Sequence, residues 1–333
     1  MKHLRKFLSV PDGKPAQSNV ISITLEVWGE RMRKSFKILL ITSSICIIFL
    51  ISLTGVVGVI IHKAMEKEMD QDLPFFQSLK MVLALDYDSE KEIKLKEERN
   101  LEQHHHISIY YPDDFTELVP LTKETLNWAI KKNQELFGVV KEVPLDFIIV
   151  KNYEELEGLS GLVDISGFYS DFDKIMAITY HDKDSLLAQK ETPLYFFQKT
   201  ILHEYTHYIL ARMTNDSNKG ISLYPTWFRE GVSEYVGNDQ TNVDYSGFRL
   251  IPLVELDTQE QWQVARLQDG ADIYNQSYFA ISYLVDTFGT GIIKKILDET
   301  NSTENFEQGF LKATDLTVTT FEKNFSDAIE MER

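Results

Sequence analysis

The segment ILHEYTHYIL, residues 201–210, places two histidines four residues apart in an apolar run, with a glutamate directly after the first. In a helix, four residues turn by about 400°, so His203 and His207 project in the same direction, one turn apart. Two ligands of one metal ion need this arrangement, and Glu204 is placed to reach a water held by that metal. A short H-E-x-x-H pattern also recurs by chance, so the motif needs support from elsewhere in the chain.

The helix that carries this motif has recognisable ends. It is expected to begin at Thr192 and Pro193, because threonine caps free N–H groups and proline suits a first helical turn. It is expected to end near Met213, before the polar segment TNDSNKG. Its charged residues argue against a helix buried in a membrane, and therefore against an intramembrane protease.

A second block, PTWFREGVSEYVG at residues 225–237, supplies a third candidate ligand. Pro225 is expected to open a helix and Gly237 to close it. Glu230 lies in its apolar centre, where a carboxylate is costly to bury unless a cation accompanies it. Glu234 shares the face of Glu230 and could accept the second N–H of a ligating imidazole. Catalytic zinc takes three protein ligands, so this block completes a plausible set.

Together, HEYTH and WFREGVSEY resemble the gluzincin pattern, H-E-x-x-H followed by W-[LF]-x-E-G-x-x-E-Y. The likeness is to the thermolysin-like domain of the aminopeptidase N group and its bacterial "peptidase MA-like" relatives, over residues 105–330. It implies one zinc per chain, held by His203, His207 and Glu230, with Glu204 as general base. It also places Glu234 at the acidic position that orients a ligand.

A third block, IYNQSYFAISYLVDTFG at residues 273–289, matches a helix that a tyrosine opens in the aminopeptidase group. The resemblance implies that the hydroxyl of Tyr274 stabilises the oxyanion of the reaction. Packing in the core is the alternative role for this residue. Tyr278 or Tyr283 could also be the true counterpart.

Two departures from the aminopeptidase pattern bear on specificity. The spacer between His207 and Glu230 is 22 residues, which is longer than usual and affects a loop. The Gly-Ala-Met-Glu-Asn strand that binds a free amino terminus is absent, and a hairpin at 166–179 is expected in its place. The edge of that hairpin could pair with an extended peptide, which favours an endopeptidase.

Residues 38–61 form an uncharged run of 24 residues, long enough to cross a hydrocarbon core of about 30 Å. The run is too long for a signal-peptide core, and no small-residue cleavage site follows it, although a cleavable signal is the alternative. Basic residues at 31–37 precede the run and acidic residues at 66–72 follow it. The positive-inside rule therefore predicts a single-pass cell-membrane protein with a cytoplasmic N-terminus and an extracellular C-terminal domain.

Charge and cysteine content agree with an exported domain. Residues 1–62 carry a net charge of +5 and the remainder −22, within a total of −17. The acidic remainder argues against nucleic acid as a partner, because phosphates would be repelled. Cys46, the only cysteine, lies in the apolar run, so the domain outside it has no disulfide. The run of His104, His105 and His106 is expected to be a solvated surface rather than a second metal site.

The expected fold class is α+β: one transmembrane helix, then a gluzincin domain with a small sheet followed by helices. The predicted function is a membrane-anchored zinc metallopeptidase that hydrolyses peptide bonds. The alternative is a non-catalytic surface binding or sensor domain that retains the gluzincin fold, although the complete set of ligands and base favours an enzyme.

The expected parts are a basic cytoplasmic segment at 1–37, the span at 38–61, a helical stalk at 62–103 and the peptidase domain at 104–330. Within that domain, strands are expected at 106–111 and 144–150, a helix at 122–138, the hairpin at 166–179, and mostly helices after residue 190.

Overall fold

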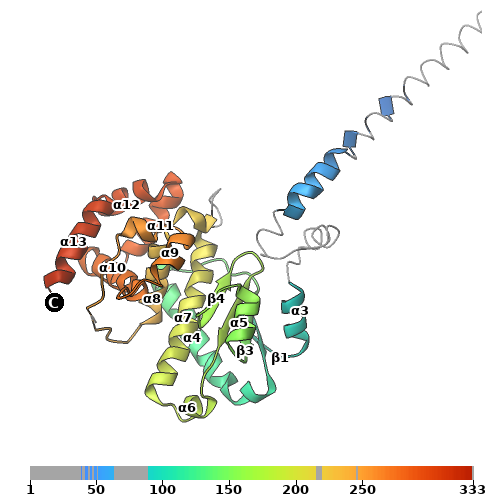
Figure 1. Cartoon of the computed structure of the whole chain (residues 1–333), viewed down its shortest axis with the longest axis horizontal. Coiled ribbons are helices and arrows are strands. Elements are labelled where there is room, and N and C mark those ends of the chain that lie inside the picture. Colours follow the sequence, from blue (N-terminus) through green and yellow to red (C-terminus); the bar gives the residue numbers. More distant parts are fainter. Residues whose placement is uncertain are drawn as a thin grey trace, which may run out of the picture. The chain divides into compact units, whose positions relative to one another are not determined.

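The computed structural model describes residues 39, 42, 43, 46, 49, 50, 52–63, 89–214, 220–244 and 247–331. The chain divides into two units, Met1–Ala84 and Leu85–Arg333 (Figure 1). In the first unit, all the described residues are helical. Part of the expected span at 38–61, and the expected basic segment at 1–37, lie outside the described residues. Within the part that is described, the structure contains no helix with the length and apolar character needed to cross a bilayer.

The second unit contains a five-stranded mixed sheet in the order β1-β2-β3-β5-β4. The pairs β2–β3 and β3–β5 are parallel, whereas β1 pairs with β2, and β4 with β5, in antiparallel fashion. The predicted strands and the predicted hairpin are therefore confirmed. The strands are β1 (Asn100–His104), β2 (Ile107–Tyr111), β3 (Leu145–Val150), β4 (Gly167–Ser170) and β5 (Ile175–Thr179).

β1 begins before the expected domain boundary at residue 104, inside the segment assigned to a stalk. Its sequence, NLEQH, has an exposed or half-exposed side chain at every position, so it lacks the apolar alternation that indicates a strand. Pairing with β2, from Asn100 opposite Tyr111 to His104 opposite Ile107, keeps it in the sheet. A short helix, α3 (Glu90–Glu97), precedes it.

Both faces of the sheet are covered. Alternate side chains such as Ile109, Phe147 and Ile149 belong to the main core, while Ile148 and Val150 pack with Leu156 of α5 on the opposite face. The helices that follow the sheet gather on one side in Figure 1. The helices of this unit after α3 are α4 (Val119–Phe137), α5 (Tyr153–Ser160), α6 (Lys183–Leu187), α7 (Glu191–Thr214), α8 (Thr226–Gly237), α9 (Gln259–Ala265), α10 (Ile273–Phe288), α11 (Ile292–Thr303), α12 (Phe306–Thr314) and α13 (Val318–Met331).

The three helices of the sequence blocks form the centre of this unit. α7 begins at Glu191, slightly earlier than expected, so Pro193 lies within the first turn, where no N–H partner is lost. α7 contacts β4, β5, α4 and α8, which explains why apolar residues occupy every side of it. α8 begins after Pro225 and ends at Gly237, as predicted.

α8 and α10 approach each other closely at a glycine. A Cβ atom at Gly231 would lie 2.6 Å from the carbonyl oxygen of Ser277 and 2.8 Å from Cγ1 of Ile281. Any larger residue would therefore push the two helices apart. This contact fixes the second and third sequence blocks against each other, beside α7.

Candidate metal centre

Three candidate ligand atoms from α7 and α8 converge on one point. The Nε2 atoms of His203 and His207 are 3.0 Å apart, and Oε2 of Glu230 lies 3.4 Å from the first and 3.5 Å from the second. Tetrahedral zinc with ligand bonds of about 2.0–2.1 Å separates its ligand atoms by about 3.3 Å. The observed separations of 3.0–3.5 Å are close to this edge length, so the three residues fit a zinc ion.

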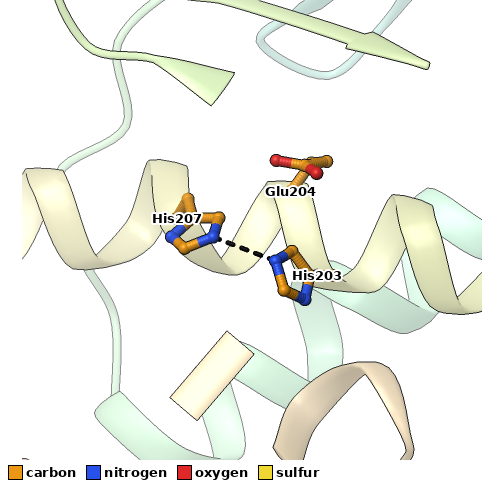
Figure 2. A group of neighbouring side chains, drawn as sticks. All are labelled: His203, Glu204 and His207. Carbon is orange, nitrogen blue, oxygen red and sulfur yellow. Dashed lines mark hydrogen bonds between the residues drawn. The ribbon is translucent and has the colours of Figure 1, made fainter. Parts of the chain in front are cut away.

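Glu204 lies beside this set rather than within it. Figure 2 shows both imidazoles on one side of α7 and the carboxylate of Glu204 on the adjoining side of the helix. His203, Glu204 and His207 could themselves hold a metal, since one ligand atom from each lies within 4.8 Å of the others. Oε2 of Glu230, however, lies within 3.5 Å of Nε2 in both imidazoles. In the described part of the chain Glu204 forms no ion pair with either histidine, although their charges act on it. This contrast favours Glu230 as the third ligand and leaves Glu204 free for proton transfer.

The second ring nitrogen of His203, Nδ1, contacts the carboxylate of a glutamate on α8. Nδ1 of His203 lies 3.0 Å from Oε1 of Glu234, and Nζ of Lys199 lies 2.7 Å from the other oxygen of that carboxylate. Asn238 donates a further hydrogen bond of 3.2 Å to Glu234. A carboxylate in this position fixes the tautomer and orientation of a ligating imidazole.

The pKa values describe the centre before metal binding. Burial alone would lower the pKa of His203, but hydrogen bonds with Glu230 and Glu234 outweigh it and raise the pKa to about 10. Burial opposes the ionisation of Glu234, yet His203 and Lys199 lower its pKa to about 2. His203 is thus protonated without a metal, and metal binding must displace this proton because a ligating imidazole is neutral.

Burial raises the pKa of Glu204, while the neighbouring imidazoles act in the opposite direction. The side chain is only 6% exposed, so little water competes for its carboxylate. A carboxylate with a raised pKa is a better proton acceptor, which suits a general base.

The centre opens onto a cleft of about 330 Å³ beneath the edge of the sheet. β4 lines it through Gly167, Phe168 and Tyr169, and Trp262 of α9 lies on another wall. A Cβ atom at Gly167 would lie 3.0 Å from Cγ and from Oε1 of Glu204. Only glycine therefore lets this edge strand lie directly against the carboxylate.

A second hollow, also of about 330 Å³, shares part of the same lining. Gly167, His203, Glu204 and Tyr274 border both hollows, so the cleft extends to either side of the candidate centre. An extended ligand that passes the centre therefore has space in both directions.

The three tyrosines of the third block lie in different surroundings. Tyr274 borders both hollows, and its ring centroid is 6.5 Å from that of His203 and 5.1 Å from that of Trp262. Tyr278 instead stacks on Tyr235, and Tyr283 packs among phenylalanines of α13. Position in the cleft thus favours Tyr274 over the two alternatives, while its role stays a prediction.

The histidine run is only partly as expected. His105 is exposed, in agreement with a solvated surface. His106 is not, because its ring stacks on Tyr208 with centroids 5.3 Å apart and its side chain is only 10% exposed. Burial lowers the pKa of His106. The prediction was therefore wrong for this residue, which belongs to the wall between the sheet and α7.

Two further residues of this site, Lys199 and Gly167, were not predicted from the sequence, whereas Arg229 was expected either to tune the site or to reach solvent. Lys199 lies four residues before His203, so it shares the helix face of the two histidines, and that spacing could have revealed it. Arg229, directly before Glu230, lines the cleft. Gly167 gave no signal, because a glycine at the start of a short strand has many possible causes.

Comparison with known proteins identifies the family of this chain. The family model of the peptidase MA superfamily matches residues 125–331, so the chain belongs to this superfamily. The protein named "Uncharacterized protein YhcO" from Bacillus subtilis (strain 168) is 35% identical over 222 residues, 67% of this chain and 69% of YhcO. A crystal structure of Legionella pneumophila aminopeptidase A in complex with aspartic acid matches with a TM-score of 0.43 and 12% identity. That match covers 68% of this chain and 28% of the aminopeptidase chain.

Proposed function

We propose that this protein is a zinc-dependent peptidase that hydrolyses peptide bonds. The observation that carries the proposal is the convergence of His203, His207 and Glu230 at separations of 3.0–3.5 Å, with Glu204 beside them in the cleft. When bound, zinc lowers the pKa of a coordinated water towards about 7 and polarises a substrate carbonyl. Membership of the peptidase MA superfamily supports this class of reaction.

The side chains of the site supply the remaining steps. The carboxylate of Glu204 accepts the proton of the attacking water and delivers it to the nitrogen of the departing amine. The hydroxyl of Tyr274 donates a hydrogen bond to the carbonyl oxygen as negative charge develops there. Glu234 holds Nδ1–H of His203, and Lys199 balances the charge of Glu234.

An internal segment of a polypeptide is the proposed substrate. Among the described residues, β4 is the last strand in the sheet order, and no strand of that part pairs with its outer edge, which could therefore receive an extended peptide. The hollows on both sides of the centre leave room for residues before and after the scissile bond. These features, together with the missing aminopeptidase strand motif, support an endopeptidase.

The direct experiment combines metal analysis with an unbiased digest. The purified full chain, loaded with one equivalent of zinc, is incubated with a library of quenched peptides and the products are identified by mass spectrometry. Cleavage within blocked peptides is the expected result. A zinc-loaded protein that cleaves none of them would contradict the proposal and favour a binding or sensor domain.

Tyr274→Phe is expected to retain zinc and to lower kcat about tenfold, since one hydrogen bond to the developing charge is lost, worth about 1–1.5 kcal/mol. Steady-state kinetics on the best library peptide measure the change. Tyr278→Phe is the matched control, because that ring stacks on Tyr235 outside the two hollows. Equal activity of both variants and the parent would remove Tyr274 from the mechanism.

We further propose that residues 38–61 anchor the protein in the cell membrane and that the peptidase domain is extracellular. The motivation is the uncharged run and the basic flank before it. Protease added to intact cells or spheroplasts is expected to remove the C-terminal domain, as followed by an antibody against that domain. Digestion only after lysis would overturn this orientation.

A further inference from the structure

Arg229 holds a positive charge in the wall of the cleft, where the neighbouring Glu230 is the carboxylate whose charge acts on it. Its Nη2 donates a hydrogen bond of 2.8 Å to Oγ1 of Thr226. Its Nε is buried and has no acceptor within the described part of the chain. Glu230, the adjacent carboxylate, is directed at His203 and His207 instead. A half-buried guanidinium that is always charged is costly to keep in this state unless an anion joins it.

Two other buried arginines of the domain pair with a carboxylate, whereas Arg266, which is more exposed, is held by neutral oxygens. Arg99 pairs with Glu155 at 2.7 Å, and Arg212 pairs with Asp171 at the far end of the cleft. Arg266 donates to the carbonyl oxygen of Val163 at 2.7 Å. Among the described residues, Arg229 forms no ion pair with any carboxylate, although it borders the hollow that would receive a substrate.

Charge differs between the two hollows on either side of the centre. The hollow without Arg229 is bordered by Asp164 and Asp272, neither of which forms an ion pair in the described part of the chain. Lys199 also borders it, but that lysine is engaged with Glu234 at 2.7 Å. The hollow of Arg229 also has carboxylates, but Asp171 pairs with Arg212 and Glu230 faces the two histidines. An anionic group would therefore be repelled on the side of Asp164 and Asp272 and attracted on the side of Arg229.

We propose that Arg229 is a specificity-determining residue that binds a carboxylate of the peptide substrate. The inference rests on the proposed peptidase function and adds a substrate class to it: peptides with a carboxylate on the Arg229 side of the scissile bond. The planar guanidinium can donate two parallel hydrogen bonds to such a group. An acidic side chain and the free C-terminus of a short peptide present the same chemistry, so the test separates them.

The test measures binding, so that it does not depend on turnover. The full chain carrying Glu204→Gln is loaded with zinc and titrated with fluorescent, N-acetylated alanine hexapeptides. One arm scans a single Glu against Gln through the peptide, each with an amidated C-terminus. The other arm compares the free C-terminal acid with the amide on the all-alanine peptide.

In the Glu204→Gln parent, one acidic form is expected to bind about 10- to 100-fold more tightly than its neutral counterpart, as for a hydrogen bond to a charged group. Adding Arg229→Gln should abolish this preference and leave the Kd of the neutral peptides within about threefold. Arg249→Gln is the matched control, because it removes an exposed positive charge that lies outside both hollows. Zinc content and Tm establish that each variant is folded.

The two arms decide the source of the carboxylate. Preference in the Glu scan alone identifies an acidic side chain, and preference in the C-terminal arm alone identifies a free C-terminus. Equal affinities of acidic and neutral peptides in the parent would overturn the inference without any variant, and so would equal effects of Arg229→Gln and Arg249→Gln. If the carboxylate inference failed in either way but the wild type cleaved neutral peptides, the proposed peptidase function would still stand. Acid-selective binding without turnover by the wild type would instead remove the peptidase function and retain the carboxylate site.

Discussion

Glu204→Gln is expected to keep the fold and one zinc per chain while peptide hydrolysis falls at least about a hundredfold. The glutamine has nearly the same shape, and Glu204 makes none of the close imidazole contacts that Glu230 makes, so metal binding should survive. What disappears is a proton acceptor beside the attacking water, and such groups contribute about 10²–10⁴-fold in rate. The measurement is kcat on the best library peptide, with zinc content determined on the same sample.

A matched control separates this effect from the general loss of a carboxylate. Glu142 also contacts a histidine, with its Oε2 3.0 Å from Nδ1 of His106, but it lies outside both hollows. Glu142→Gln should hydrolyse peptides at nearly the wild-type rate. If Glu204→Gln cleaved as fast as wild type, a different group would have to act as general base.

Removal of any one candidate ligand is expected to abolish both zinc binding and activity. His203→Ala, His207→Ala and Glu230→Gln each leave two protein ligands, whereas catalytic zinc sites use three. Mass spectrometric metal analysis after dialysis should give about one zinc per wild-type chain and almost none in the variants. Zinc should also raise the Tm of the wild type but not that of the three variants, since a ligand at 100 times its Kd stabilises the fold by about 2.7 kcal/mol.

His105→Ala is the control for this series, because His105 is an exposed histidine with its Nε2 3.1 Å from Oδ1 of Asn127. It should bind zinc as the wild type does. Full occupancy in Glu230→Gln would place the third ligand elsewhere, and Glu204 would then be the first alternative because it groups with the two histidines.

Much of the fold followed from local patterns. β-formers and alternation located β2 and β3, and Pro225 and Gly237 marked the ends of α8. β1 was not predicted, because its side chains bury no apolar face and only its pairing with β2 defines it as a strand. The pairing of β3 with β5, and the position of β4 at the edge, involve residues distant in sequence that no local pattern encodes.

The candidate site likewise combines features that the local sequence predicts with contacts that only the folded chain creates. The sequence by itself determined that His203 and His207 share one face of a helix, because a spacing of four residues fixes that geometry wherever the helix packs. Only the tertiary structure decided that Oε2 of Glu230 lies 3.4–3.5 Å from Nε2 of both histidines and that Gly167 leaves no room for a Cβ atom beside Glu204, because these contacts join separate elements. It alone also left Arg229 without a carboxylate partner among the described residues, since the approach of α8 to α7 turns Glu230 towards the histidines.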